Sequence, residues 1–270
     1  MNWSLDKFSE QFWRATDLDD QIEVLLKAIG SFGYDTYLFG LVPKTTASRS
    51  RDFIMISNYD PEWLSEYSRE EMFTHDRTIS MALLSQDPIL WSSLRTPEER
   101  SIMTPEEIHV HERATAWGYG TGVSIPLWLP NSTVRYGMSF SRRGLTDAKK
   151  HDAMFREHQQ TLVSIAKLFF LGVDISGKIY SHYKLTDLEL QIIALLANGR
   201  KVKEIAYALN KDQTRNSGQS YREPLSESAL HQRITKIWKK VGTNNTNHLV
   251  AAFSQLGVTP EVNQSLPFVD

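Results

Sequence analysis

Apolar residues recur with two different periods along residues 1–175. Short runs of apolar residues predict strands at 35–42, 52–57, 121–127 and 134–141. Apolar residues at helical spacings predict helices at 5–30, 104–117 and 146–175. The second of these helices opens with Thr-Pro-Glu-Glu, a sequence that favours a capped helix start. Strands followed by helices and then by further strands predict an α+β fold with an antiparallel sheet between layers of helices.

The last third of the chain has only the helical period. Helices are predicted at 186–199, at 202–209 and, within 226–258, on either side of Gly242. The first of them opens with Thr-Asp-Leu-Glu, a capping-box sequence. In the third helix the apolar residues share one face, and the remaining face is polar and basic. This pattern is typical of a helix-turn-helix with a basic recognition helix, and an exposed helix face without a nucleic-acid partner has the same pattern.

These patterns predict two domains. Residues 1–175 form an N-terminal α/β/α sandwich of the kind found in GAF- and PAS-like sensors, and residues 176–184 are the expected linker. Residues 185–270 form an all-α, four-helix domain with an inserted polar loop at 211–224. The charges follow this division, because 185–258 carries ten Lys and Arg against six Asp and Glu, whereas 1–184 carries 20 against 24. A basic module behind an acidic one fits a nucleic-acid-binding protein.

Composition excludes several kinds of site. The chain has no cysteine, so disulfides, thiol nucleophiles and cysteine metal sites are excluded. The start lacks the pattern of a signal peptide, and Lys167 interrupts the most apolar run, so we expect a cytoplasmic protein that does not bind membranes. Histidine pairs at metal-ligand spacing, a nucleophile elbow and a phosphate loop are all missing. We therefore expect neither an enzyme nor a cofactor.

The stretch from Tyr59 onward carries the candidate ligand site. Tyr59, Trp63 and Tyr67 are each four residues apart, so they share one face of a helix that an Asp-Pro pair would start. Such an aromatic face also fits an ordinary core. Asp76 favours a ligand, because its neighbours are apolar and a buried carboxylate needs hydrogen-bond donors that a small polar ligand can supply.

The spacing of these residues resembles the signal-binding half of the LuxR-type quorum-sensing regulators. The Tyr-x3-Trp-x3-Tyr sequence is followed by Asp76, thirteen residues after Trp63, and by Trp91, fifteen residues after Asp76. The resemblance implies an acyl-homoserine lactone as the ligand. Its lactone carbonyl would accept a hydrogen bond from Trp63 and its amide N–H would bond to Asp76. The other ligand-binding residues that the resemblance implies are Tyr59, Tyr67, Thr78, Trp91, Ser124 and Ser139, and the two serines fit pairing within the sheet equally well.

The C-terminal part resembles the DNA-binding domain of the same family. Glu189, Gly199, the run from Lys203 to Ala206, and Gly242 stand at family positions. The resemblance implies a homodimer that binds double-stranded DNA through the third helix. We expect base contacts from Ser228, His231, Gln232 and Thr235, a base or phosphate contact from Arg233, and phosphate contacts from Lys236, Lys239 and Lys240.

Arg77 follows the key aspartate where the family usually has proline, a change that concerns the loop shape more than the ligand contacts. The 211–224 insertion, which replaces a short turn, leaves an alternative open. The alternative is an orphan sensor of the same fold that binds another small molecule or a protein partner, with altered or lost DNA binding.

Overall fold

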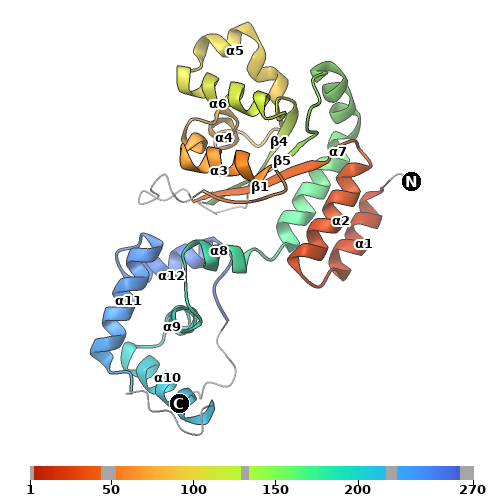
Figure 1. The fold of residues 1–270 in the computed structure, drawn as a ribbon. Coiled ribbons are helices and arrows are strands. Elements are labelled where there is room, and N and C mark those ends of the chain that lie inside the picture. Colours follow the sequence, from red (N-terminus) through yellow and green to blue (C-terminus); the bar gives the residue numbers. More distant parts are fainter. Residues whose placement is uncertain (1–2, 44–52, 129–133, 217–223, 262–270) are drawn as a thin grey trace. The chain divides into compact units, whose positions relative to one another are not determined.

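The computed structural model (Figure 1) describes residues 3–43, 53–128, 134–216 and 224–261. The chain divides into two compact units, Met1–Asp174 and Ile175–Asp270. The first unit contains a five-stranded antiparallel sheet with the strand order β2-β1-β5-β4-β3. Its strands are β1 (Thr36–Pro43), β2 (Ile54–Ser57), β3 (Ile89–Leu90), β4 (Gly122–Trp128) and β5 (Val134–Ser141). The four longer strands match the four that the sequence predicts.

Helices cover both faces of this sheet, which confirms the predicted α+β sandwich. On one face lie α1 (Leu5–Arg14), α2 (Leu18–Gly30) and the long α7 (Ala148–Gly172). On the other lie α3 (Pro61–Arg69), α4 (Arg77–Ala82), α5 (Pro97–Ile102) and α6 (Pro105–Ala116), with the 3-10 turns η1 (Met72–Thr74) and η2 (Trp91–Arg95). The site described below lies between this second layer and the sheet.

The single helix predicted at 5–30 is wrong, because the structure has two helices there. Ala15 is extended, with φ −63° and ψ 134°, and ends α1. Asp17 then begins α2, since its carboxylate accepts the backbone N–H of Asp20 at 2.9 Å. An aspartate that caps a helix start in this way favours a break over a continuous helix.

Alternation along the strands gives the sheet two different faces. Tyr136, Met138 and Phe140 of β5 are buried towards α7, where the rings of Tyr136 and Phe170 lie 4.6 Å apart. The intervening residues of β5 are small, and Ser139 faces the cavity on the α4 side. Ser139 pairs with Ser124 of β4, and their hydroxyl groups are 2.9 Å apart. Alternate residues of these two strands therefore face opposite sides of the sheet.

The second unit is helical. It contains α8 (Ser176–His182), α9 (Asp187–Ala197), α10 (Val202–Asn216), α11 (Glu227–Val241) and α12 (Thr246–Gln255). Its core is made of fully buried apolar side chains from α9, α11 and α12, including Ile192, Leu230, Ile237, Leu249 and Phe253. The capping box predicted at Thr186 and Glu189 is present, and Gly242 ends α11 with a left-handed φ of 74°.

The prediction of a linker at 176–184 is wrong, because these residues form α8 and belong to the second unit. Ile179 is fully buried, and the Tyr180 hydroxyl donates to the Val258 carbonyl oxygen at 2.7 Å. The Tyr183 ring also lies near Phe253, with 6.5 Å between the centroids. Burial of apolar side chains, which a polar sequence such as Ser-Gly-Lys does not predict, orders this segment.

The inserted segment begins within a helix. A helix end was expected near Leu209, yet α10 continues to Asn216, and 217–223 lie outside the described residues. The continuation has no Gly or Pro to end it. At the base of the insertion the Asn210 side chain accepts the Leu225 N–H at 2.7 Å and donates to the Leu225 carbonyl oxygen at 3.1 Å. These two bonds close the base and hold α10 and α11 together there.

Across the described ranges, every helix falls short of the length and apolar character needed to cross a lipid bilayer.

Candidate ligand-binding site and nucleic-acid interface

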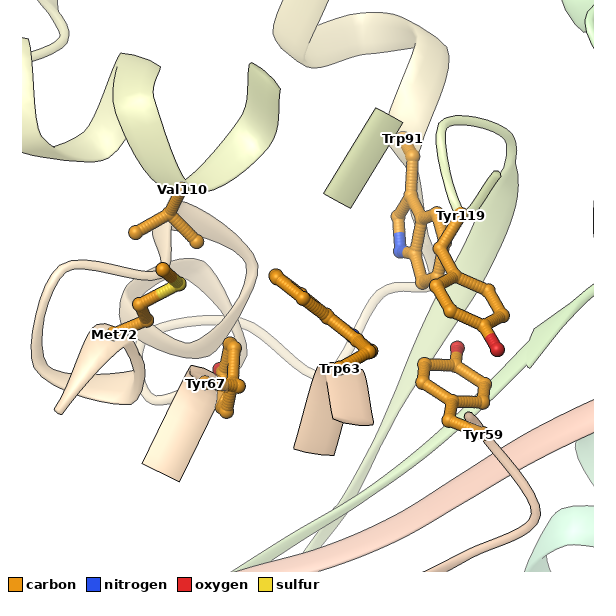
Figure 2. Close-up of a cluster of buried hydrophobic side chains, with 7 residues drawn as sticks. All are labelled: Tyr59, Trp63, Tyr67, Met72, Trp91, Val110 and Tyr119. Atoms are coloured by element: carbon orange, nitrogen blue, oxygen red, sulfur yellow. The ribbon is translucent and has the colours of Figure 1, made fainter. Parts of the chain in front are cut away.

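A cavity of about 100 Å³ lies between α3, α4, α6 and the sheet. Aromatic side chains form much of its wall, and Figure 2 shows Trp63 between Tyr67 and Val110 on one side and Tyr59 and Tyr119 on the other. These side chains are all at most 6% exposed. The space exceeds what one water molecule needs, so the cavity can hold part of a small organic ligand.

Trp63 and Asp76 both line this cavity, as the sequence predicts. Trp63 lies on α3, and its ring centroid is 5.4 Å from that of Tyr67. Among the residues that the structure describes, none accepts a hydrogen bond from the Trp63 indole. A buried tryptophan N–H usually has an acceptor, so this donor can serve a ligand.

Asp76 receives its hydrogen bonds from the protein. One carboxylate oxygen accepts the Thr78 backbone N–H at 2.8 Å and the Thr78 hydroxyl at 2.6 Å, which caps α4. The other oxygen accepts the Tyr67 hydroxyl at 2.8 Å. Burial and the negative charge of Asp76 raise the pKa of Tyr67, so Tyr67 stays protonated and donates. The protein therefore supplies three of the donors that this carboxylate needs. A carboxylate has about four acceptor positions, however, and can accept one bond more.

Tyr59 lies at the sheet end of the cavity. Its ring stacks on Tyr119 with 4.2 Å between centroids and an interplanar angle of 8°. Its hydroxyl shares a hydrogen bond with the Ser141 hydroxyl at 3.1 Å, and burial raises its pKa. The Tyr119 hydroxyl accepts the Asp60 N–H at 2.8 Å, immediately before α3. Tyr119 was not predicted from the sequence, where it is an aromatic residue within a glycine-rich turn.

The two serines pair within the sheet, which is one of the two interpretations that the sequence left open. Trp91 donates its indole N–H to the Ser124 hydroxyl at 2.9 Å, and Ser124 bonds to Ser139 at 2.9 Å. Ser139 also lines the cavity, next to Trp91. These hydrogen bonds therefore fix the orientation of the Trp91 and Ser139 side chains in the cavity wall.

Charged residues form the part of the wall made by α4 and α6. Arg77 donates from Nε to Glu99 at 2.8 Å and lies 3.7 Å from Glu107. These pairs join α4 to α5 and α6, so the residue that replaces the family proline has a structural role here. Thr96 caps the start of α5, where its hydroxyl accepts the Glu99 backbone N–H at 3.3 Å. Thr78 lines the cavity beside Arg77.

Like Tyr119, His111 on α6 lines this cavity and was not predicted from the sequence. Its Nε2 lies 3.3 Å from the Arg95 Nε, which can only donate, so a neutral ring carries its proton on Nδ1. Burial and the Arg95 charge lower the pKa of His111, which keeps the ring neutral near pH 7. Val110 and Ala114 on α6 also line the cavity. The sequence does not identify them as site residues, because this requires knowing that α6 contacts the site.

In the second unit, α11 exposes one polar face. The exposed residues among the predicted DNA contacts are Ser228, His231, Gln232, Thr235, Lys236, Lys239 and Lys240, while Arg233 is half-buried. Lys240 differs from the others, because its ammonium donates to Glu189 at 2.6 Å and to the Lys184 carbonyl oxygen at 2.8 Å. Burial raises the pKa of Glu189, but hydrogen bonds from Lys240 and Thr186 outweigh it and leave that pKa low.

A sandwich with a cavity beside its sheet, joined to a helical unit with an exposed basic helix, defines a class of protein: the ligand-responsive transcription regulators. Residues 17–173 match the family described as the autoinducer binding domain. The chain belongs to this family, that of the LuxR-type quorum-sensing regulators.

Individual relatives agree with this assignment. The transcriptional activator AnoR of Acinetobacter nosocomialis is 23% identical over 254 residues, which cover 90% of this chain and 93% of AnoR. The transcriptional activator PhzR of Pseudomonas fluorescens is 28% identical over 86 residues, which cover 32% of this chain and 35% of PhzR. SdiA in complex with octanoyl-rac-glycerol matches with a TM-score of 0.50 at 19% identity over 93% of each chain, which shows the shared fold. AnoR and PhzR are transcriptional activators, so the prediction that the chain is not an enzyme is confirmed.

Proposed function

We propose that the chain binds an acyl-homoserine lactone in the cavity and binds double-stranded DNA as a homodimer through α11. The observation that carries the ligand proposal is that Trp63 and Asp76, thirteen residues apart, line one cavity. The Trp63 N–H would donate to the lactone carbonyl. Asp76 would accept the amide N–H in the position that Tyr67 and Thr78 leave vacant on its carboxylate. Tyr59 and Trp91 would contact the rest of the head group.

The DNA proposal rests on the exposed face of α11. Base contacts would come from Ser228, His231, Gln232 and Thr235, as in other helix-turn-helix proteins whose recognition helix enters the major groove. Lys236 and Lys239 would contact phosphates. The closed base of the insertion at Asn210 and Leu225 supports this proposal, because it holds the two helices of the motif together.

We assign Lys240 a positioning role instead of a phosphate contact, because Glu189 and Lys184 engage its ammonium. Lys236→Ala should weaken binding to all DNA sequences equally and reduce the slope of log affinity against log salt by about one. Lys240→Ala should instead lower the stability of the second unit by about 1–3 kcal/mol, because it leaves a buried carboxylate without its partner. Gel-shift titrations at several salt concentrations and urea unfolding distinguish these two effects. A unit reduction of the salt slope in a stably folded Lys240→Ala protein would contradict the assignment.

The ligand proposal is tested by expressing the protein beside lactone synthases and identifying the bound molecule by mass spectrometry. We expect one acyl-homoserine lactone at near-equimolar amount in the wild type, and much less in Trp63→Phe, which keeps an aromatic ring but removes the N–H. Recovery of a different small molecule would support the alternative of another ligand in the same fold. The polar wall made by Arg77 and the neutral His111 favours this alternative, because neither residue belongs to the family pattern from which the lactone was inferred.

A further inference from the structure

The extension of α10 past Leu209 adds nothing to the apolar core of the second unit. The buried apolar side chains of α10 all come before it, namely Ile205, Ala206, Ala208 and Leu209. Residues 211–216 continue the helix with the sequence Lys-Asp-Gln-Thr-Arg-Asn, which contains no apolar residue. At about 1.5 Å per residue, this extension lengthens α10 by about 9 Å. The core of the unit therefore does not account for the extension.

The extension begins beside the start of α11. Asn210 is held against Leu225 by the hydrogen bonds of 2.7 and 3.1 Å, and α11 begins two residues after Leu225, at Glu227. Lys211 directly follows Asn210. In helix-turn-helix proteins the first residues of the recognition helix reach the base edges, and the preceding helix crosses the DNA backbone. The extension therefore begins at the end of the motif that would lie against a duplex.

Tyr207 and Lys211 form an exposed surface where α10 passes into the extension. They are four residues apart, so they share one face of the helix. The Tyr207 side chain is 53% exposed, and Lys211 is exposed as well. The Lys211 ammonium lies 5.8 Å from the centroid of the Tyr207 ring, which is a cation–π contact. Among the described residues, none bonds to the Tyr207 hydroxyl. The surface thus presents a positive charge next to a hydroxyl donor.

A phosphate backbone has the chemistry that this surface fits. Lysine ammonium and tyrosine hydroxyl groups both donate to phosphate oxygens in protein–DNA complexes, and such contacts carry no sequence information. Glu204, which lies one turn before Tyr207, does not oppose an anion at this surface. Its carboxylate accepts the Lys201 backbone N–H at 3.0 Å, at the other end of α10. The positive charge of Lys211 therefore lies away from the Glu204 carboxylate.

We propose that Tyr207 and Lys211 bind the phosphate backbone of DNA beside the groove that α11 enters. The inference rests on the proposed DNA binding through α11. A helix that ended at Leu209 would lack Lys211, so this contact comes from the insertion itself. The insertion then strengthens binding to every duplex and leaves the choice of sequence to α11.

The test measures binding of the full chain to two duplexes of about 30 base pairs, which accommodate two half-sites one helical turn apart. The wild type selects one duplex from a random library, and the other has an unselected sequence. The protein is expressed beside lactone synthases, so that a lactone is present while it folds. Fluorescence anisotropy then gives the affinity for each duplex at several salt concentrations.

Lys211→Ala should weaken binding to both duplexes by the same factor, about five- to tenfold near 0.1 M salt. It should also reduce the slope of log affinity against log salt by about one. Tyr207→Phe keeps the ring and removes the hydroxyl, so it should weaken both duplexes about threefold and leave the slope unchanged. Because both side chains are exposed, neither variant should change urea unfolding.

Lys178→Ala is the matched control. It removes the same charge from an exposed position on α8, whose Tyr180 and Tyr183 rings pack near Phe253 of α12. Both affinities and the salt slope should remain those of the wild type. An equal reduction of the slope by Lys178→Ala and Lys211→Ala would overturn the inference, because the effect would then follow from net charge alone.

The remaining outcomes separate this inference from the proposed function. If the wild type selects a sequence but Lys211→Ala leaves the slope unchanged or strengthens binding, the α10 contact is overturned and DNA binding through α11 stands. If the wild type binds every duplex alike, Lys211→Ala weakens all of them and Gln232→Ala changes none, the α10 contact is supported and sequence reading by α11 fails. Binding to neither duplex overturns both.

Discussion

The two faces of the central sheet come from the same strands yet have opposite contents. On the α7 face, alternate residues of β4 and β5 are large and fully buried, and Val123, Met138 and Phe140 have no exposed surface. On the α4 face, the intervening residues include Ser124, Gly137 and Ser139, and these three line the first cavity or a second one of about 60 Å³ that adjoins it. One strand pair therefore supplies a packed core on one side and the wall of a binding site on the other.

The packed α7 face stabilises the first unit without a ligand, whereas on the α4 face a bound ligand would add to the stability. α4 illustrates the second case, because none of its residues is buried. Polar bonds hold it in place at both ends, through Asp76 and Arg77 at the start and through Trp128 at the end. A ligand in the cavities would bury the apolar side chains of α4, and its binding free energy would add to the stability of the folded state.

The largest effect should come from the packed face. Phe140→Ala removes a fully buried ring near Tyr34, where the two ring centroids are 5.8 Å apart. We expect a loss of about 3–5 kcal/mol in the free energy of unfolding. The neighbouring substitution Ser139→Ala, on the cavity face of the same strand, removes one hydrogen bond and should cost about 1 kcal/mol. Urea unfolding without ligand measures both, and equal losses would contradict the difference between the faces.

A smaller effect on stability, and a clear effect on binding, should follow from Asp76→Asn. Asparagine caps helices about as well as aspartate, so α4 should keep its start and the unfolding free energy should change by less than about 1 kcal/mol. The charge-assisted bond to the ligand amide is lost, which should weaken binding of N-octanoyl-homoserine lactone about tenfold or more. Calorimetry with the lactone and urea unfolding without it give the two values. A large loss of stability with unchanged affinity would make Asp76 a purely structural cap.

Periodicity was sufficient to predict the strands, because a single chain displays it directly. The joint role of Trp63 and Asp76, which line one cavity, was an expectation from the family resemblance. The partner of Asp76 was harder to foresee. Tyr67 reaches the carboxylate because the chain reverses at Glu71, whose φ of 50° is left-handed and uncommon for a residue with a side chain.

Other parts of the site depend on contacts between segments that lie far apart in the sequence. Tyr119 stacks on a residue sixty positions earlier, and His111 receives its hydrogen bond from Arg95 on another element. No local pattern specifies such pairs. The same limit explains α8, whose polar sequence predicts a linker until the burial of Ile179 is known. The continuation of α10 has a different cause, because the polar composition of the insertion indicates a loop although its first residues contain no Gly or Pro to end the helix.

The smallest expected effect concerns His111 and the pH dependence of the cavity face. Its pKa in the folded state lies below the ordinary 6.5, because burial and Arg95 disfavour the charged ring. Between that lowered pKa and 6.5 the unfolded chain binds more protons than the folded one, so stability rises with pH across this window. The contribution is fully present above 6.5 and is lost as the pH falls through the folded-state pKa. Thermal unfolding of the wild type from pH 7.5 to 5 should therefore show a decline in stability that His111→Gln reduces.

His158→Gln is a suitable control, since that histidine lies on α7 and is absent from the lining of both cavities. If the two variants changed the pH dependence of stability equally, His111 would not account for it. The two faces of the sheet would then differ in packing but not in their response to pH.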